Sequence, residues 1–135
     1  MKFFKLGFLS LTLCLFLSGC FGRIQPIYMV HNHPIPPSAD FMTLDEISTV
    51  IERSAIDRQW VVKKEYPGLL RLTYSRKTHQ AVIEVSFNKS HYSIKYVSSQ
   101  DLLYNGSMIH RNYNRWVANL ELDIEMNLQK AATAQ

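Results

Sequence analysis

The chain has 135 residues, of which 47% are hydrophobic, and it carries 15 basic against 11 acidic side chains. The length is enough for one domain, and the hydrophobic content is that of an ordinary globular domain. When Lys2 and Lys5 of the N-terminal segment are set aside, 13 basic side chains remain against 11 acidic ones, a net charge of about +2. We therefore do not expect a nucleic-acid-binding protein.

Residues 1–19 have the pattern of a secretory signal peptide. Lys2 and Lys5 precede an uncharged apolar run from Leu6 to Leu17, and a basic start followed by about 7–15 apolar residues is typical of such a signal. A transmembrane helix needs ~20 apolar residues. A helix of the folded domain would be amphipathic, whereas this run is apolar on every side. We expect the segment to direct export and then to be removed.

The sequence Leu17-Ser18-Gly19-Cys20 ends this run and resembles the lipobox of bacterial lipoproteins. The resemblance implies cleavage between Gly19 and Cys20, an S-diacylglycerol on the Cys20 thiol and N-acylation of its new amine. Two or three acyl chains give a stable membrane anchor, whereas one gives only marginal binding. Phe21 stands where an Asp tends to retain enterobacterial lipoproteins in the inner membrane, so the resemblance implies the outer membrane, facing the periplasm.

The rest of the chain is expected to form a tether and one domain. Cys14 leaves with the signal and Cys20 carries lipid, so the mature protein should have neither a free thiol nor a disulfide. Residues 20–41 show no apolar period and are predicted to be an extended, proline-containing tether. Its prolines are Pro26, Pro34, Pro36 and Pro37. A single α+β periplasmic domain is expected over residues 42–135.

The domain is predicted to begin with a helix. Thr43 and Glu46 have the spacing of a capping box, in which the Thr hydroxyl and the Glu carboxylate each accept from the other residue's amide. Apolar residues then recur at helical spacing up to a predicted end near Arg58. They are Leu44, Ile47, Ile51 and Ala55.

Three or four strands are predicted next, joined by short polar turns. Apolar and polar residues alternate through them, as in an antiparallel meander with one solvent-exposed face. The runs are 59–66, 69–76, 80–87 and 92–96. Asn105-Gly106 then breaks the pattern, and a helix that could be capped by Ser107 is predicted from Ile109 to Leu128. With both helices on the apolar sheet face, the fold class is α+β, a two-layer sandwich.

No constellation of residues points to catalysis or to a bound metal. His31 and His33 are two residues apart, but a closed metal site needs three or four ligands. Glu121 and Glu125 fit a solvated helix face, and no nucleophile motif accompanies the other histidines. We expect a protein that is not an enzyme and that needs no cofactor or metal.

The densest polar and aromatic cluster lies between Ile109 and Trp116. Structural use of this segment is favoured, but five of its polar side chains are also candidates for an interaction surface. They are His110, Arg111, Asn112, Asn114 and Arg115. Together with Trp60, Gly68, Ser98 to Leu102 and Asn119-Leu120, the segment resembles a family of small proteobacterial envelope lipoproteins. The resemblance supports the fold and the location, and it supplies no activity.

Two functions are therefore expected. The first is a non-enzymatic module for protein interaction or assembly support, with an envelope protein as partner, because exposed sheet edges can pair with a partner strand. The alternative is a binding module for a small ligand, a lipid or a cell-wall fragment. A groove lined by aromatic side chains would favour this alternative. Its expected platform, the polar sheet face, displays Arg71, Thr73, Glu84, Ser93 and Lys95.

The lipid anchor gives a first testable prediction. In the Cys20→Ser variant the thiolate that would be alkylated is missing, so the precursor should stay uncleaved and unlipidated. Metabolic labelling with a fatty-acid analogue measures this. Label retained by the variant would contradict lipid attachment at Cys20.

Overall fold

A computed structural model describes residues 22–134, so the expected signal peptide and Cys20 lie outside the described residues. The described chain is α+β, with two helices and antiparallel sheets, as the sequence predicted. Its elements in chain order are β1 (Ile24–Pro26), β2 (Val30–Pro34), the 3₁₀ helix η1 (Pro37–Ala39), α1 (Leu44–Asp57), β3 (Val61–Tyr66), β4 (Leu69–Arg76), β5 (His79–Phe87), β6 (His91–Gln100), β7 (Met108–His110) and α2 (Arg111–Thr133).

The main sheet has five strands in the order β2-β6-β5-β4-β3, all antiparallel, rather than the expected three or four. Strands β3 to β6 form the predicted meander. The turn at Pro67-Gly68 requires glycine, because Gly68 has a φ of +90° and an added Cβ would lie 2.8 Å from the carbonyl oxygen of Phe87. A second, two-stranded sheet pairs β1 with β7.

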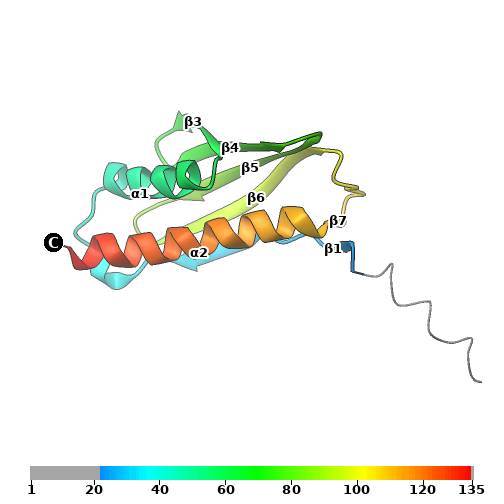
Figure 1. Ribbon diagram of the computed structural model, residues 1–135. Coiled ribbons are helices and arrows are strands. Elements are labelled where there is room, and N and C mark those ends of the chain that lie inside the picture. Colours follow the sequence, from blue (N-terminus) through cyan, green and yellow to red (C-terminus); the bar gives the residue numbers. More distant parts are fainter. Residues whose placement is uncertain (1–21, 135) are drawn as a thin grey trace, which may run out of the picture.

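One hydrophobic core connects the sheet with both helices. Figure 1 shows α1 and α2 side by side on one side of the sheet. Alternating residues of β4 and β5 are buried, including Leu72 opposite Ile83, because successive side chains of a strand point to opposite faces. The buried side chains of α2 recur at three- and four-residue intervals and form its apolar stripe. They are Tyr113, Val117, Leu120, Ile124 and Leu128.

Residues 24–42 pack on the domain instead of forming the expected tether. Strand β2 pairs with β6 at the sheet edge, and four side chains of this region join the core, namely Val30, Ile35, Ala39 and Met42. The prolines fit because Pro34 ends an edge strand and Pro37 starts a 3₁₀ helix, positions at which no amide donor is needed. No apolar period marks this region because each of its short elements contributes at most one buried residue.

Both helix starts are capped, one of them where the sequence predicted it. The Thr43 amide donates to the Glu46 carboxylate at 2.7 Å and the Glu46 amide donates to the Thr43 hydroxyl at 3.2 Å, which lowers the pKa of Glu46. In contrast, α2 starts at Arg111 and not near Ser107. His110 is its N-cap, because residues 108–110 pair with β1 instead of joining the helix. Among the described residues, no helix is both long and apolar enough to cross a bilayer.

The capping box gives a second prediction. Thr43→Ala removes the acceptor for the Glu46 amide and should lower the free energy of unfolding by ~0.5–2 kcal/mol. The matched control is Thr49→Ala on the same helix, which removes no cap and should be nearly neutral because alanine favours the helix. Chemical denaturation measures both, and equal effects of the two variants would contradict the role of the cap.

Candidate functional site

A basic cavity of about 490 Å³ lies at one end of the domain. Its walls come from the C-terminus of α1 and the residues after it, the hairpin of β4 and β5, and the first half of α2. These segments lie far apart in the sequence and meet because α1 and α2 pack side by side against the sheet (Figure 1). The lining residues are Arg58, Trp60, Tyr74, Arg76, Lys77, His79, Asn112, Arg115, Trp116 and Asn119.

Three aromatic rings in contact support the cavity. The ring centroids of Trp60 and Tyr74 are 5.3 Å apart, and those of Tyr74 and Trp116 are 4.6 Å apart, both in tilted contact. These distances are in the favourable range for aromatic pairs. Trp60 is only 3% exposed, whereas the other two rings are half-buried. The rings therefore form a rigid apolar floor beneath the charged side chains.

The charged residues that line the cavity are all basic. None of its lining residues is acidic. Within residues 22–134, no carboxylate oxygen lies within 4.0 Å of a charged nitrogen of Arg76, Lys77 or Arg115. Cations that share a concave surface without counter-charges create a local positive potential, which attracts anions. The cavity is therefore suited to a ligand with at least one negative charge.

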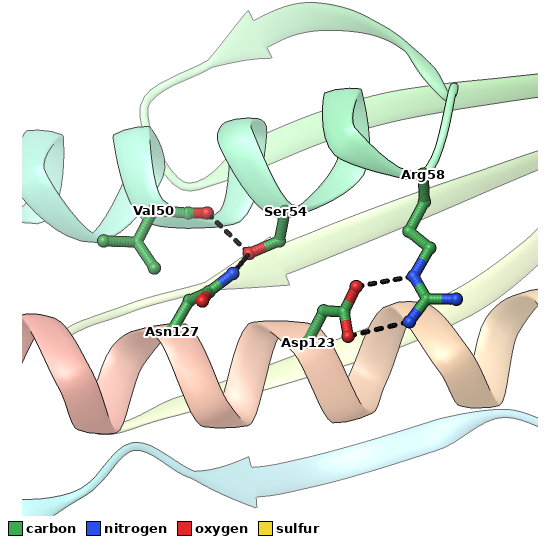
Figure 2. Close-up of polar contacts among 5 residues, drawn as sticks. All are labelled: Val50, Ser54, Arg58, Asp123 and Asn127. Carbon is green, nitrogen blue, oxygen red and sulfur yellow. Dashed lines mark hydrogen bonds and ion pairs between the residues drawn. The ribbon is translucent and has the colours of Figure 1, made fainter.

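Arg58 is held at the cavity by polar contacts between α1 and α2, in which Arg58 binds Asp123 and Ser54 binds Asn127; we call these two contacts the clasp. Figure 2 shows its guanidinium facing the carboxylate of Asp123, with hydrogen bonds of 2.5 and 2.9 Å. One turn away, the Asn127 amide donates to the buried hydroxyl of Ser54 at 2.9 Å, and that hydroxyl donates to the carbonyl of Val50 at 2.8 Å. Since Asp123 already balances its charge, Arg58 contributes more to the shape of the cavity than to its potential.

His79 lies at the cavity wall in a defined orientation. Its Nδ1 is 2.6 Å from the carbonyl oxygen of Asp101, and since a carbonyl oxygen can only accept, Nδ1 carries the proton of this bond. The Asp101 carboxylate accepts from Thr78. The His110 ring lies 6.2 Å from the His79 ring. The pKa of His110 is lowered, first by burial of its ring and then by the nearby side chains of Arg23, His79 and Arg111. Positive charge thus extends from the cavity to the start of α2.

Backbone strain is concentrated around the same cavity. Gln59, Lys77 and Asp101 have φ values of 66°, 55° and 54°. Residues other than glycine rarely adopt positive φ values of this kind. Gln59 precedes Trp60, Lys77 lines the cavity, and Asp101 contacts His79. Such conformations cost about 1–3 kcal/mol each and tend to occur where a site must be held in place.

The five candidate residues between 110 and 115 have different roles. Asn112 and Arg115 line the cavity. His110 caps α2 through a 3.1 Å bond from the Asn112 amide. Asn114 is structural, because its amide donates to the Pro26 carbonyl at 2.8 Å and its side-chain oxygen accepts from the Tyr28 amide. Arg111 is exposed beside the N-terminal segment.

Sequence reasoning missed the other lining residues. Arg76 is the last residue of a predicted strand and Lys77 is the first residue of the turn after it, so two adjacent cations at a strand end were the available signal. The two tryptophans of the chain are both in the cavity wall, but the sequence pattern did not indicate that both contact the strand residue Tyr74.

The remaining expected sites lie elsewhere. The His33 Nδ1 is 3.5 Å from the Glu121 carboxylate, which also accepts from Tyr28, so Glu121 fastens the N-terminal segment to α2. Within the described residues, no three His, Cys, Asp or Glu side chains are grouped to bind a metal. On the polar sheet face, Arg71 pairs with Glu84 at 2.7 Å. This pair balances two of the three charges named on this face.

The clasp gives a third prediction. Arg58 lowers the pKa of Asp123, so this pair stabilises the fold above pH ~4 and its contribution is lost as pH falls through the lowered pKa. Asp123→Asn should lower stability at pH 7 by at most about 1 kcal/mol, since both groups are partly exposed. Thermal unfolding of both proteins from pH 7 to pH 2 measures this. A difference that does not shrink in acid would contradict the ion pair.

Comparison of the chain with protein-family models, with curated proteins and with solved structures finds no match. Two features of the chain itself bear on its function: the geometry of this cavity and the sequence motif around Cys20. Within the described residues, the feature with the clearest chemical preference is the basic cavity with its aromatic floor.

Proposed function

We propose that this protein is a lipid-anchored protein of the bacterial cell envelope whose domain binds an anionic ligand in the basic cavity. The lipobox around Cys20 supports the anchor, and the signal peptide supports export. The outer membrane, facing the periplasm, is the proposed location. In this proposal the helices and the sheet form a two-layer sandwich, with the cavity at one end. The role is binding, without a chemical reaction.

One observation carries the ligand-binding proposal. Arg76, Lys77 and Arg115 lie around one cavity without a carboxylate among its lining residues. Keeping like charges close together is unfavourable unless an anion or water offsets their repulsion. A hydrogen bond to a charged group contributes about 1.5–3 kcal/mol. A ligand with two negative charges, such as a phosphate or a pyrophosphate group, would satisfy more than one of these cations at once.

The sheet edges offer little support for adding a partner strand. Strand β3 carries Lys63 and Lys64 at one edge, and charged edge residues oppose strand pairing between chains. At the other edge β2 has an irregular register near Asn32, whose φ is 46°, and ends in Pro34. Both features disrupt the regular row of amides and carbonyls that a partner strand needs.

A protein-interaction module is the second candidate function. It is favoured by apolar side chains on the outer face of α2, where Leu122 and Met126 are 51% and 60% exposed and lie one helical turn apart. Exposed apolar side chains that lie together are typical of a protein-binding surface. A partner at this face would leave the basic cavity free, so the two functions are compatible.

Anion binding gives the fourth prediction. Because both tryptophans of the chain line the cavity, intrinsic fluorescence should report its occupancy directly. Titration with inorganic pyrophosphate should change the fluorescence along a saturating curve. Arg115→Gln removes one unpaired cation and should weaken binding by about tenfold or more, which corresponds to ~1.5 kcal/mol.

The matched control is Arg53→Gln, which removes an exposed arginine of α1 that does not line the cavity. This variant should bind pyrophosphate as the unmodified protein does. Equal losses in both variants would indicate only a general charge effect. A flat fluorescence titration of the unmodified protein, confirmed by calorimetry, would refute the proposed function.

A further inference from the structure

The proposed lipid anchor is close in sequence to the folded domain. Only residues 21–23 separate Cys20 from Ile24, the first residue of β1. An extended chain spans at most ~3.6 Å per residue, so a connection of this length can reach at most about 14 Å from the strand. For comparison, the 23 residues of α2 make a helix about 35 Å long, at ~1.5 Å per residue. A connection this short keeps one particular end of the domain beside the membrane.

That end is the one that carries the basic cavity. Strand β1 pairs with β7, so Ile24 lies opposite His110 at the start of α2. The Arg111 amide donates to the Arg23 carbonyl at 2.9 Å. His110 in turn lies beside His79 of the cavity wall. Figure 1 shows β1, β7, the start of α2 and the turn between β4 and β5 together at the same end of the molecule.

Five exposed cations gather at this end. They are Arg23, Arg76, Lys77, Arg111 and Arg115. Asp101 is a carboxylate near them, and it already interacts with Thr78 and His79. Each basic residue close to an anionic bilayer favours binding by about fivefold. The cluster therefore has the charge, and the expected anchor gives it the position, to contact lipid headgroups.

We propose that this basic end docks on the membrane that holds the lipid anchor, with the phosphate of an anionic phospholipid headgroup entering the cavity. The inference rests on the proposed function, because it needs both the anchor at Cys20 and an anion-binding cavity. The inference goes beyond the proposed function in two ways. It identifies the ligand as the headgroup of a lipid that is part of the bilayer, and it gives the orientation of the domain on that bilayer. The long axis of α2 then points away from the bilayer, and the end with η1 and the C-terminus faces outward.

The test uses the mature lipidated protein reconstituted into phosphatidylcholine vesicles, with or without phosphatidylglycerol. A quencher on the lipid headgroup reports how close the two tryptophans lie to the membrane surface. We expect strong quenching when phosphatidylglycerol is present and weak quenching when it is absent. High salt or added pyrophosphate should relieve the quenching, because salt screens the surface charge and pyrophosphate competes for the cavity.

Charge-neutralised variants identify the docking end. Arg76→Gln with Lys77→Gln should raise the phosphatidylglycerol fraction needed for half-maximal quenching by at least about fivefold. The control pair is Lys89→Gln with Lys130→Gln, two exposed lysines far from the cavity, in the turn after β5 and near the end of α2. This pair should behave as the unmodified protein does. Unchanged thermal midpoints show that the variants remain folded.

Each outcome decides between the proposals. Pyrophosphate binding without quenching would overturn membrane docking but leave the anion-binding function in place, with a free phosphate compound as its ligand. Quenching that falls equally in both double variants would overturn the assignment to this end. Failure of the protein to float with phosphatidylcholine vesicles would overturn the lipid anchor. Absence of both quenching and pyrophosphate binding would refute the docking inference and the proposed function together.

Discussion

The packing of α2 along the sheet is the constraint on which the rest of the structure depends. Its buried stripe, from Tyr113 to Leu128, fills the space beside α1 and completes the core. Its polar residues hold the neighbouring segments: Asp123 binds Arg58 of the α1 C-terminus, and Glu121 and Asn114 bind the N-terminal segment. Displacing this helix would therefore open the core, release the N-terminal segment and separate the walls of the cavity.

The same packing explains how a small domain supports a strained, positively charged site. Residues such as Gln59 and Lys77 adopt unfavourable backbone conformations, and the clustered cations repel one another. Neither would persist on a flexible surface. Here Trp60 is buried against Tyr74, and the Trp60 amide donates to the Ala55 carbonyl at 3.0 Å, which fixes the chain immediately after α1. The core thus stabilises geometry that the local sequence alone disfavours, as is common at functional sites.

Local patterns predicted much of the fold. The capping box at Thr43, the alternation through β4 and β5 and the apolar stripe of α2 each follow from a short stretch of sequence with a clear period. The strands of residues 24–34 were not predictable in this way, since β2 is specified by its pairing with β6 and not by its own composition. The cavity was predicted only in part. Arg115 belonged to a visible cluster, whereas Arg58 and Trp60 reach the site only through tertiary contacts.

The proposed function requires that an anion binds between Arg76, Lys77 and Arg115, above the aromatic floor. Nuclear magnetic resonance tests it most directly, because the indole N–H groups of Trp60 and Trp116 give two resolvable signals within the cavity wall. On addition of pyrophosphate, both indole signals and the Arg115 side-chain signal should shift along one common saturation curve, while the Arg53 signal stays in place. If the signals of all arginines shift while the indole signals do not move, the anion is attracted only non-specifically by positive charge. That result would contradict a binding site in this cavity.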